Sequence, residues 1–291
     1  MQLEQFTAHW QPLIREALQH QLQRVGVPQL QAAMAHLLGR GKLFRPLLAL
    51  ITYDALHGGE PEAVLRLVTP LELIHTFTLI HDDLPCMDDA ELRRGVPAVH
   101  RQFGEANAVL AGDALANLAL HLIASETAPV TAEVRLLLVR SATRATAAVV
   151  EGQMLDLLGE RRRLSADELE RMERLKTGAL IGACCETGAL LAGGSADLVT
   201  SLLAIGERIG LAFQVRDDLL SIEATEEQAG KTLSTDLKKE KSTYVRALGL
   251  EGARHYLERL IAVAADEIHT LNLPKPELLL AITHQAAERD R

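Results

Sequence analysis

The chain has 291 residues, of which 48% are hydrophobic and 24% charged, the composition of a soluble globular protein. Its net charge of −9 argues against a nucleic-acid binder whose affinity rests on neutralising phosphates. The three cysteines, Cys86, Cys184 and Cys185, do not make a disulfide framework, so we expect a reducing, cytoplasmic location.

The most apolar segments are predicted to be buried helices. The N-terminal segment carries Glu4 and Trp10 and lacks the unbroken apolar core of a signal peptide. Residues 106–124 and 179–194 are apolar but contain an aspartate and a glutamate and are rich in Ala and Gly. Small residues of this kind let buried helices pack closely, so we expect no membrane span.

Helical periodicity runs along the whole chain. Apolar residues recur at three- and four-residue spacing over 13–23, 63–80, 132–150 and 201–215. Ser165 and Glu168 predict a capping box for a helix that runs toward Lys176. Residues 223–242 are polar and contain glycine, which predicts a long loop of the kind that often acts as a lid. No linker or repeat divides the chain, so we expect one all-α domain of about ten helices over residues 1–291.

An acidic cluster stands out in the segment HDDLPCMDDAELRRG. Pro85 is expected to end the preceding helix just past Asp83, so Asp82 and Asp83 lie at a helix C-terminus, where the helix dipole disfavours negative charge. Mg²⁺ removes this penalty because it takes a few carboxylates together with waters and substrate phosphates. Arg93 and Arg94 would bind the same phosphates. The alternative is a solvated acidic turn.

A second acidic pair, Asp217 and Asp218, lies late in another apolar helix, in FQVRDDLLS. Two acidic helix ends that face each other could hold a metal–diphosphate cluster between them. Alone, such a pair is more often a solvated helix face. The basic residues that accompany the two pairs are Lys42, Arg45, Lys176, Lys231 and Lys241. Any one of these is more often a surface charge, but together with two acidic pairs they favour a diphosphate site.

These segments together resemble the trans-isoprenyl diphosphate synthases, the polyprenyl synthetase family that includes farnesyl and geranylgeranyl diphosphate synthases. DDLPCMD followed by RRG resembles the family's first aspartate-rich motif in its version with two extra residues, and FQVRDD resembles the start of the second. GKLFRP, ELIHTFTLIHDD, AGDAL, GQMLDL, KTGAL and EKSTY resemble the landmarks between them, over nearly the whole chain. The resemblance implies the all-α isoprenoid synthase fold around a central cavity, usually in a homodimer.

The resemblance also implies a role for each matching residue. The implied Mg²⁺ ligands, for three ions per active site, are Asp82, Asp83, Asp88 and Asp217. The residues implied to bind the allylic diphosphate are Arg93, Lys176, Thr177, Gln214, Lys231 and Lys241. Those implied to bind isopentenyl diphosphate are Lys42, Arg45, His75 and Arg94. The implied catalytic residues are Asp82, Asp88, Arg93, Lys176 and Asp217. From spacing alone His75 shares a helix face with Asp82, and a core histidine is an equal alternative.

The implied reaction is a prenyl transfer in isoprenoid biosynthesis. In this family the allylic diphosphate ionises and the double bond of isopentenyl diphosphate attacks the resulting carbocation. Negative charge builds on the departing diphosphate, where Mg²⁺ and fixed Lys and Arg charges would stabilise it. We therefore expect an Mg²⁺-dependent transferase that makes farnesyl diphosphate from isopentenyl diphosphate and dimethylallyl or geranyl diphosphate.

Three residues depart from the family pattern. Ser221 stands where the last aspartate of the second motif would be, Leu43 stands where an arginine is usual, and Ala90 replaces an acidic residue. The first two motivate an alternative, a catalytically weak homologue that binds prenyl diphosphates. A terpene cyclase is another alternative, but it ionises one substrate and has no use for a second diphosphate site.

Phe77 is the candidate for setting product length. It lies five residues before Asp82, about 7.5 Å deeper in the cavity at the helical rise of about 1.5 Å per residue. Thr78, the next residue, is also a candidate for the chain-length position, but its side chain does not add to the obstruction that Phe77 would present to the growing product. A bulky aromatic here, with the longer first motif, resembles the bacterial farnesyl type. Ordinary core packing of Phe77 is an equal alternative, and geranyl and geranylgeranyl diphosphate are the neighbouring products.

Overall fold

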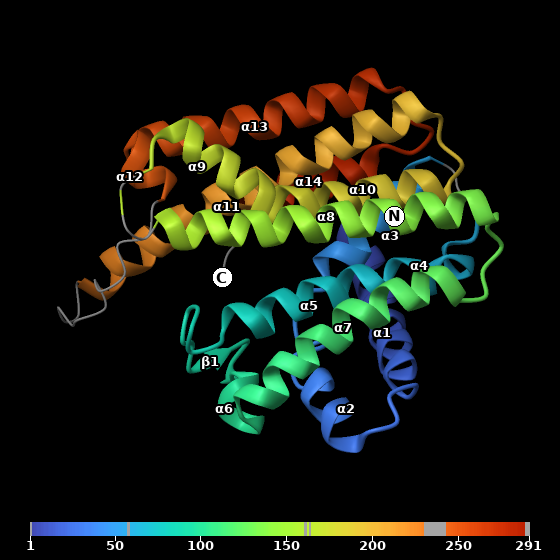
Figure 1. Cartoon of the computed structure of the whole chain (residues 1–291). Coiled ribbons are helices and arrows are strands. Elements are labelled where there is room, and N and C mark those ends of the chain that lie inside the picture. Colours follow the sequence, from blue (N-terminus) through green and yellow to red (C-terminus); the bar gives the residue numbers. More distant parts are fainter. Residues whose placement is uncertain (1, 57–58, 160–161, 163, 230–242, 289–291) are drawn as a thin grey trace.

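The structure, a computed structural model, describes residues 2–56, 59–159, 162, 164–229 and 243–288, which are almost entirely helical (Figure 1). The first helices are α1 Leu3–Leu22, α2 Pro28–Ala35, α3 Phe44–Ala55, the short η1 Pro61–Ala63, α4 Leu65–Val68, α5 Pro70–Asp82, α6 Val99–Phe103 and α7 Glu105–Ser125. The later ones are α8 Ala132–Gly159, α9 Ala166–Glu173, the π-helical turn η2 Arg174–Gly178, α10 Ala179–Leu191, α11 Ala196–Ala229, α12 Tyr244–Leu248, α13 Leu250–Thr270 and α14 Glu277–Glu288. The prediction of an all-α fold is confirmed.

Helix α10 lies at the centre of the bundle. All its residues from Leu180 to Leu190 are buried, and it packs on α3, α8 and α11. In Figure 1, α8, α10, α11, α13 and α14 run roughly side by side, and α5 and α7 cross below them. The main hydrophobic core joins α1, α3, α5, α7, α8, α10 and the first part of α11, and a second cluster joins α9, α12, α13 and the later part of α11. Helix α11 therefore belongs to both clusters.

The helices α10 and α11 meet at backbone distance. A Cβ atom on Gly206 would lie 2.8 Å from the Cα of Gly182, and one on Gly210 would lie 2.7 Å from the Cα of Gly178. Only glycine fits such an approach, because any side chain would push the two backbones apart. This contact fixes α11 against the end of η2.

Two boundaries differ from the sequence-based expectation. The periodic stretch 63–80 is broken into α4 and α5, because Pro70 has no N–H to continue α4 and instead begins a new helix. The capping box of Ser165 and Glu168 is confirmed at the start of α9. That helix does not run unbroken to Lys176, because η2 interrupts it.

The predicted loop at 223–242 is partly wrong. Helix α11 continues to Ala229, so residues 223–229 extend it. Asp217 and Asp218 therefore lie inside a long helix and not at its end. The remainder of the predicted lid, with Lys231 and Lys241, lies outside the described residues. One short feature was not predicted, the antiparallel pair of two-residue strands β1 Leu92–Arg93 and β2 Val96–Pro97.

Candidate active site

Asp82 and Asp88 are brought together by a tight turn at the end of α5. Asp82 is the last helical residue and Asp83 is the C-cap, as predicted. The chain then folds back, so that the N–H of Asp88 donates to the carbonyl of Asp82 at 2.8 Å. Burial raises the pKa of Asp82 to about 6; Lys176 opposes this shift and Asp88 adds to it. The positive charges of the described neighbours do not offset the burial of this carboxylate.

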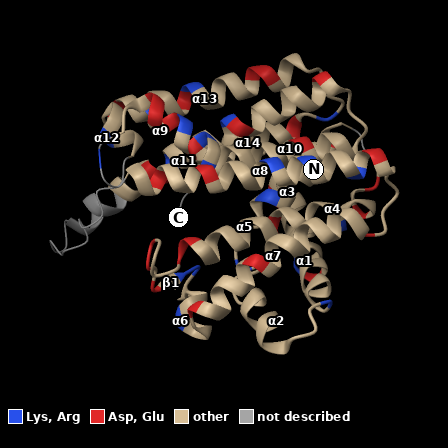
Figure 2. Ribbon diagram, in the orientation of Figure 1, with Lys and Arg blue, Asp and Glu red and all other residues tan. Residues whose placement is uncertain are grey.

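Asp83 anchors Arg93. Its side chain is completely buried, and one carboxylate oxygen accepts hydrogen bonds from Nε and Nη2 of Arg93 at 2.9 and 2.5 Å. Burial raises the pKa of Asp83, and the hydrogen bonds from Arg93 oppose that rise. Arg93 itself lies on β1 and stays partly exposed. Asp83 thus supports the site through Arg93. Figure 2 shows acidic and basic residues gathered at this end of α5 and in the adjoining β1 segment.

Lys176 links three parts of the fold. It lies in η2, its ammonium group pairs with the carboxylate of Asp156 on α8, and its charge acts on Asp82 at the end of α5. These carboxylates and Glu173 raise the pKa of Lys176 against the opposing effect of burial. The lysine is therefore positively charged at neutral pH. Thr177 follows it in the same turn.

The second acidic pair is divided between two environments. Asp218 is buried and accepts hydrogen bonds from the N–H of Tyr244 at 2.8 Å and from the amide of Gln214 at 3.2 Å. Burial raises the pKa of Asp218 to about 6, against those hydrogen bonds. Asp217 is half-buried. Ser221 is exposed one turn later, and its hydroxyl donates to the carbonyl of Asp217 at 2.9 Å.

These carboxylates suit Mg²⁺ delivered with a diphosphate better than a permanent metal cage. Within the described ranges, no three His, Cys, Asp or Glu residues form a ready-made ion site. Mg²⁺ prefers hard oxygen ligands and usually takes only one or two carboxylates, completing its shell with waters and substrate phosphates. Asp82 and Asp88, which lie in one turn and whose charges act on each other, provide such donors, and a cation would stabilise the ionised form of Asp82 that burial disfavours.

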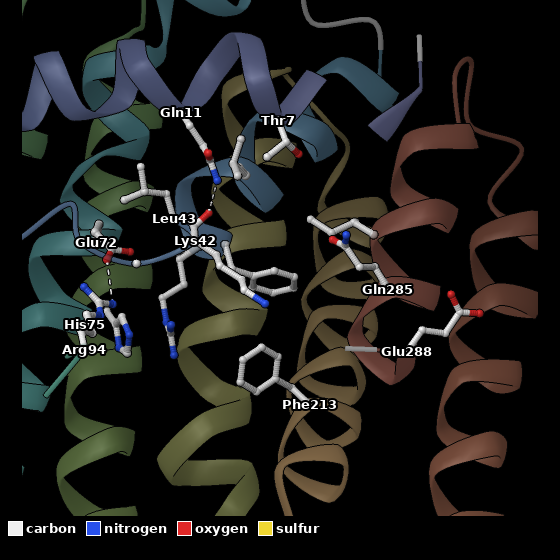
Figure 3. A pocket seen from close by; sticks show the side chains of 15 residues that line it. Thr7, Gln11, Lys42, Leu43, Glu72, His75, Arg94, Phe213, Gln285 and Glu288 are labelled. Atoms are coloured by element: carbon white, nitrogen blue, oxygen red, sulfur yellow. Dashed lines mark hydrogen bonds and ion pairs between the residues drawn. The ribbon is translucent and has the colours of Figure 1, made fainter. Parts of the chain in front are cut away.

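The residues predicted to bind isopentenyl diphosphate all line one cavity of about 730 Å³ (Figure 3). Its basic lining residues are Lys42, Arg45, His75 and Arg94. In Figure 3, Lys42, His75 and Arg94 surround the same space, with Phe213 on another wall. Lys42 and Arg45 flank the start of α3, His75 lies on α5, and Arg94 lies in the β1–β2 turn. Four separate positions in the sequence thus form one basic site.

Arg94 is held in place from two sides. It donates to the carbonyl of Leu37 at 3.0 Å and to the carboxylate of Glu72 at 3.2 Å, with its backbone in the left-handed region at φ 53°. Glu72 is almost completely buried, and burial raises its pKa while Arg94 and Arg45 lower it. Burial and the charges of Arg45 and Arg94 hold the pKa of His75 well below its usual value. His75 is therefore neutral at pH 7 and offers hydrogen bonds without charge.

Several lining residues were missed by the sequence analysis. Helices α1 and α14, from opposite ends of the chain, complete the cavity, with the residues Thr7, Gln11, Ile282, Gln285 and Glu288. Glu72 and Asp156 were also missed, although both lie within motifs that carry the family resemblance. A polar residue in an apolar helix was the available signal for Glu72. Nothing in the pattern of α1 or α14 indicated that the two helices meet.

Two further sequence-derived residues lie within the core. Leu43 is buried in the core, adopts φ 55° and also lines the cavity, at the position where the family usually has an arginine. Phe77 is 7% exposed, and its ring lies edge-to-face against His81 at 5.8 Å. The hydroxyl of Thr78 donates to the carbonyl of His75 at 2.8 Å. A role of Phe77 and Thr78 in product length stays a prediction.

Comparison with known proteins gives one consistent result. Residues 27–271 match the sequence profile of a family described as "Polyprenyl synthetase". The chain is 42% identical over 253 residues to a farnesyl diphosphate synthase of Bacillus subtilis, covering 86% of this chain and 85% of that protein. Its structure is similar to that of an FPP/GFPP synthase from Zymomonas mobilis, with a TM-score of 0.85, 34% identity and 98% coverage of both chains. It is also similar to a Helicobacter pylori geranyltransferase complexed with magnesium and isoprenyl diphosphate, with a TM-score of 0.80, 29% identity and coverage of 97% and 98%.

Proposed function

Because the chain belongs to the polyprenyl synthetase family, we propose that it is a prenyltransferase of the farnesyl diphosphate synthase type. It would join isopentenyl diphosphate to dimethylallyl or geranyl diphosphate. The observation that carries this proposal is the presence of two basic sites. One lies around Lys176 beside the carboxylates of Asp82 and Asp88, and the other is the cavity lined by Lys42 and Arg94. A protein that ionises a single diphosphate needs only the first.

The proposed mechanism assigns the first site to the allylic diphosphate. Lys176 and Arg93 would bind its phosphates and stabilise the negative charge that develops when the carbon–oxygen bond breaks. Asp82, Asp88 and Asp217 would hold Mg²⁺, and we propose three ions per site. When bound, Mg²⁺ supplies Lewis-acid stabilisation of the leaving diphosphate.

The second site would hold isopentenyl diphosphate in its cavity. Lys42, Arg45 and Arg94 provide positive charge there, and Glu72 fixes the orientation of Arg94. His75 would contribute a hydrogen bond in its neutral form.

The proposal is tested with purified protein, Mg²⁺, isopentenyl diphosphate and each allylic primer in turn, with the products separated by length. We expect Asp82→Asn to abolish prenyl transfer. The control Asp89→Asn should keep it, since Asp89 is exposed and paired with Arg101. Lys42→Gln should raise KM for isopentenyl diphosphate by about tenfold, the loss of one charged contact, with little change in KM for the primer. No turnover with any primer would instead favour the prenyl-diphosphate-binding homologue.

We also propose that the product is farnesyl diphosphate. The buried ring of Phe77, near the end of the helix that carries Asp82, supports this choice. The similar protein from Zymomonas mobilis is described as an FPP/GFPP synthase, so a longer product is the alternative to be distinguished by product length.

A second copy of the chain is the proposed partner. Helices α7 and α8 pack together and expose large apolar side chains: Val109, Leu110, Leu136, Val150, Met154 and Leu158. The last three lie at four-residue spacing and form one stripe on α8. In the helices described, α7 and residues 196–222 of α11 are long and apolar enough to span a membrane, but 39% and 50% of their apolar windows are buried in the bundle. We propose that a homodimer covers the rest of α7, in a cytoplasmic enzyme.

Light scattering tests the dimer. The unaltered protein should have twice the mass of one chain, and a Met154→Glu/Leu158→Glu variant should be a monomer, because two carboxylates cannot be buried in the contact. A monomeric unaltered protein at micromolar concentration would contradict the proposal.

A further inference from the structure

Glu173 is a buried acid that neither proposed diphosphate site uses. It is the last residue of α9 and immediately precedes η2, the turn that carries Lys176 and Thr177. Its exposed fraction is only 6%. Acids are rarely buried to this degree without a cationic partner, and the ammonium group of Lys176 is paired with Asp156. A buried acid beside a substrate-binding turn calls for a functional explanation.

The contacts of Glu173 tie it to the binding turn. The hydroxyl of Thr177 donates to one oxygen of the Glu173 carboxyl group at 3.2 Å. Among the described residues, the charged groups that act most strongly on Glu173 are Lys176 in the adjoining turn, Asp218 on α11 and Asp156 on α8. Tyr244 on α12 also lies within its electrostatic reach. Two of these four groups are carboxylates, and the tyrosine is neutral.

This environment favours the uncharged form of Glu173. Burial is the largest effect and raises its pKa to about 8; Asp218 and Asp156 act in the same direction, against Lys176 and the hydrogen bond from Thr177. At pH 7 the side chain is thus mainly a carboxylic acid. In that form it adds no negative charge to a site that must receive a diphosphate, and it does not compete with the diphosphate for Lys176.

We propose that Glu173 is a positioning residue for the allylic diphosphate site. While uncharged, Glu173 holds the hydroxyl of Thr177, and once it ionises it weakens diphosphate binding. This inference rests on the proposed function and adds a control by pH to its first site. The geometric basis is the hydrogen bond between Thr177 and Glu173 within the turn that carries Lys176. Ionised, the carboxylate would attract Lys176 toward itself and repel the incoming phosphates.

The test measures binding of geranyl S-thiolodiphosphate, an allylic analogue that does not ionise, by calorimetry with Mg²⁺ at about pH 7 and about pH 9. For the unaltered protein, Kd should rise by about three- to tenfold between the two, since one added charge acts across a partly screened site. Glu173→Gln, which keeps an oxygen for Thr177 and cannot ionise, should show no such rise. Glu173→Ala should bind more weakly than Glu173→Gln at both pH values because Thr177 loses its acceptor.

The controls separate this role from a general effect of charge or folding. Asp167→Asn removes an exposed carboxylate from the same helix and should keep the pH dependence of the unaltered protein. Binding of isopentenyl diphosphate should change with pH alike in all variants, since Glu173 does not line the second cavity.

Two results would overturn the inference: a rise in Kd for Glu173→Gln equal to that of the unaltered protein, or a Glu173→Gln variant as weak at pH 7 as Glu173→Ala. The prenyl-transfer assay judges the proposed function independently. If the unaltered protein makes prenyl products and either of these results is found, the proposed function stands and only the role of Glu173 is removed. Absence of analogue binding at pH 7 would overturn both.

Discussion

Replacing Gly152 with alanine should disturb the allylic site through the backbone that carries Lys176. Gly152 lies on α8 and faces η2, and a Cβ atom there would lie 2.3 Å from the backbone nitrogen of Lys176 and 2.6 Å from its Cα. Ordinary contacts of a Cβ atom begin at 3.4 Å, so the two segments must separate by about 1 Å. Backbone atoms cannot rotate away as a side chain does. The strain therefore moves the turn itself.

The size of the effect follows from this displacement. Overpacking of a well-packed contact costs about 1–3 kcal/mol of the free energy of unfolding. A shift of about 1 Å in a binding group can lower the rate by about 100-fold. We expect Gly152→Ala to lower kcat/KM for the allylic substrate by about 10- to 100-fold. KM for isopentenyl diphosphate should stay nearly constant, because no residue of α8 lines the second cavity.

Gly159→Ala is the matched control on the same helix. A Cβ atom on Gly159 would lie 2.9 Å from Cδ1 of Leu164, the far end of a side chain that can rotate. Gly159 is the last residue of α8, so its replacement gains less helix propensity than that of Gly152, and the backbone contact must outweigh that advantage of Gly152→Ala. Steady-state kinetics with each substrate, together with thermal unfolding followed by circular dichroism, make the comparison. A Gly152→Ala enzyme with the kcat/KM of Gly159→Ala would refute the reasoning.

Three other changes give clear expectations. Phe77→Ala should lengthen the main product by one isoprene unit if the ring limits the growing chain as proposed, and unchanged product length would assign Phe77 to core packing. Ser221→Asp should raise turnover by adding a carboxylate one turn from Asp217; an equal or lower rate would mean that metal charge is not limiting. Glu173→Gln should match the unaltered protein in the free energy of unfolding below pH 4.5 and exceed it by about 3 kcal/mol near pH 7, because the folded-state pKa of Glu173, about 8, makes its ionisation unfavourable over that range. Urea unfolding at several pH values measures the difference. Equal dependence of the two free energies on pH would contradict it.

The sequence was sufficient for the fold class and for one group of residues that meet in space. The helical period predicted the all-α fold, and Pro85 marked the end of α5 correctly. The four residues expected at the isopentenyl diphosphate site do line one cavity. These features follow from local rules of periodicity and capping, or from motifs that carry their spacing with them.

Other features depend on tertiary contacts that no local pattern contains. Polarity indicated a loop from residue 223, yet α11 continues to Ala229. The π-helical turn at Lys176 gives no sign in its composition, and it coincides with the close approach of Gly152 to that lysine. Burial of Glu173 could not be foreseen, since an acid next to arginines at a helix end normally faces solvent.

The participation of both ends of the chain in one cavity matters for how the protein is handled. Thr7 and Gln11 of α1 and Gln285 and Glu288 of α14 line the same space as Lys42. Purification tags would therefore be attached next to the two helices that line the pocket proposed for isopentenyl diphosphate, and kinetics should be recorded after their removal. The same proximity offers a reporter: with the exposed Cys86 replaced by serine, a small fluorophore on a cysteine introduced at Glu288 would sense occupancy of that pocket without touching Lys176.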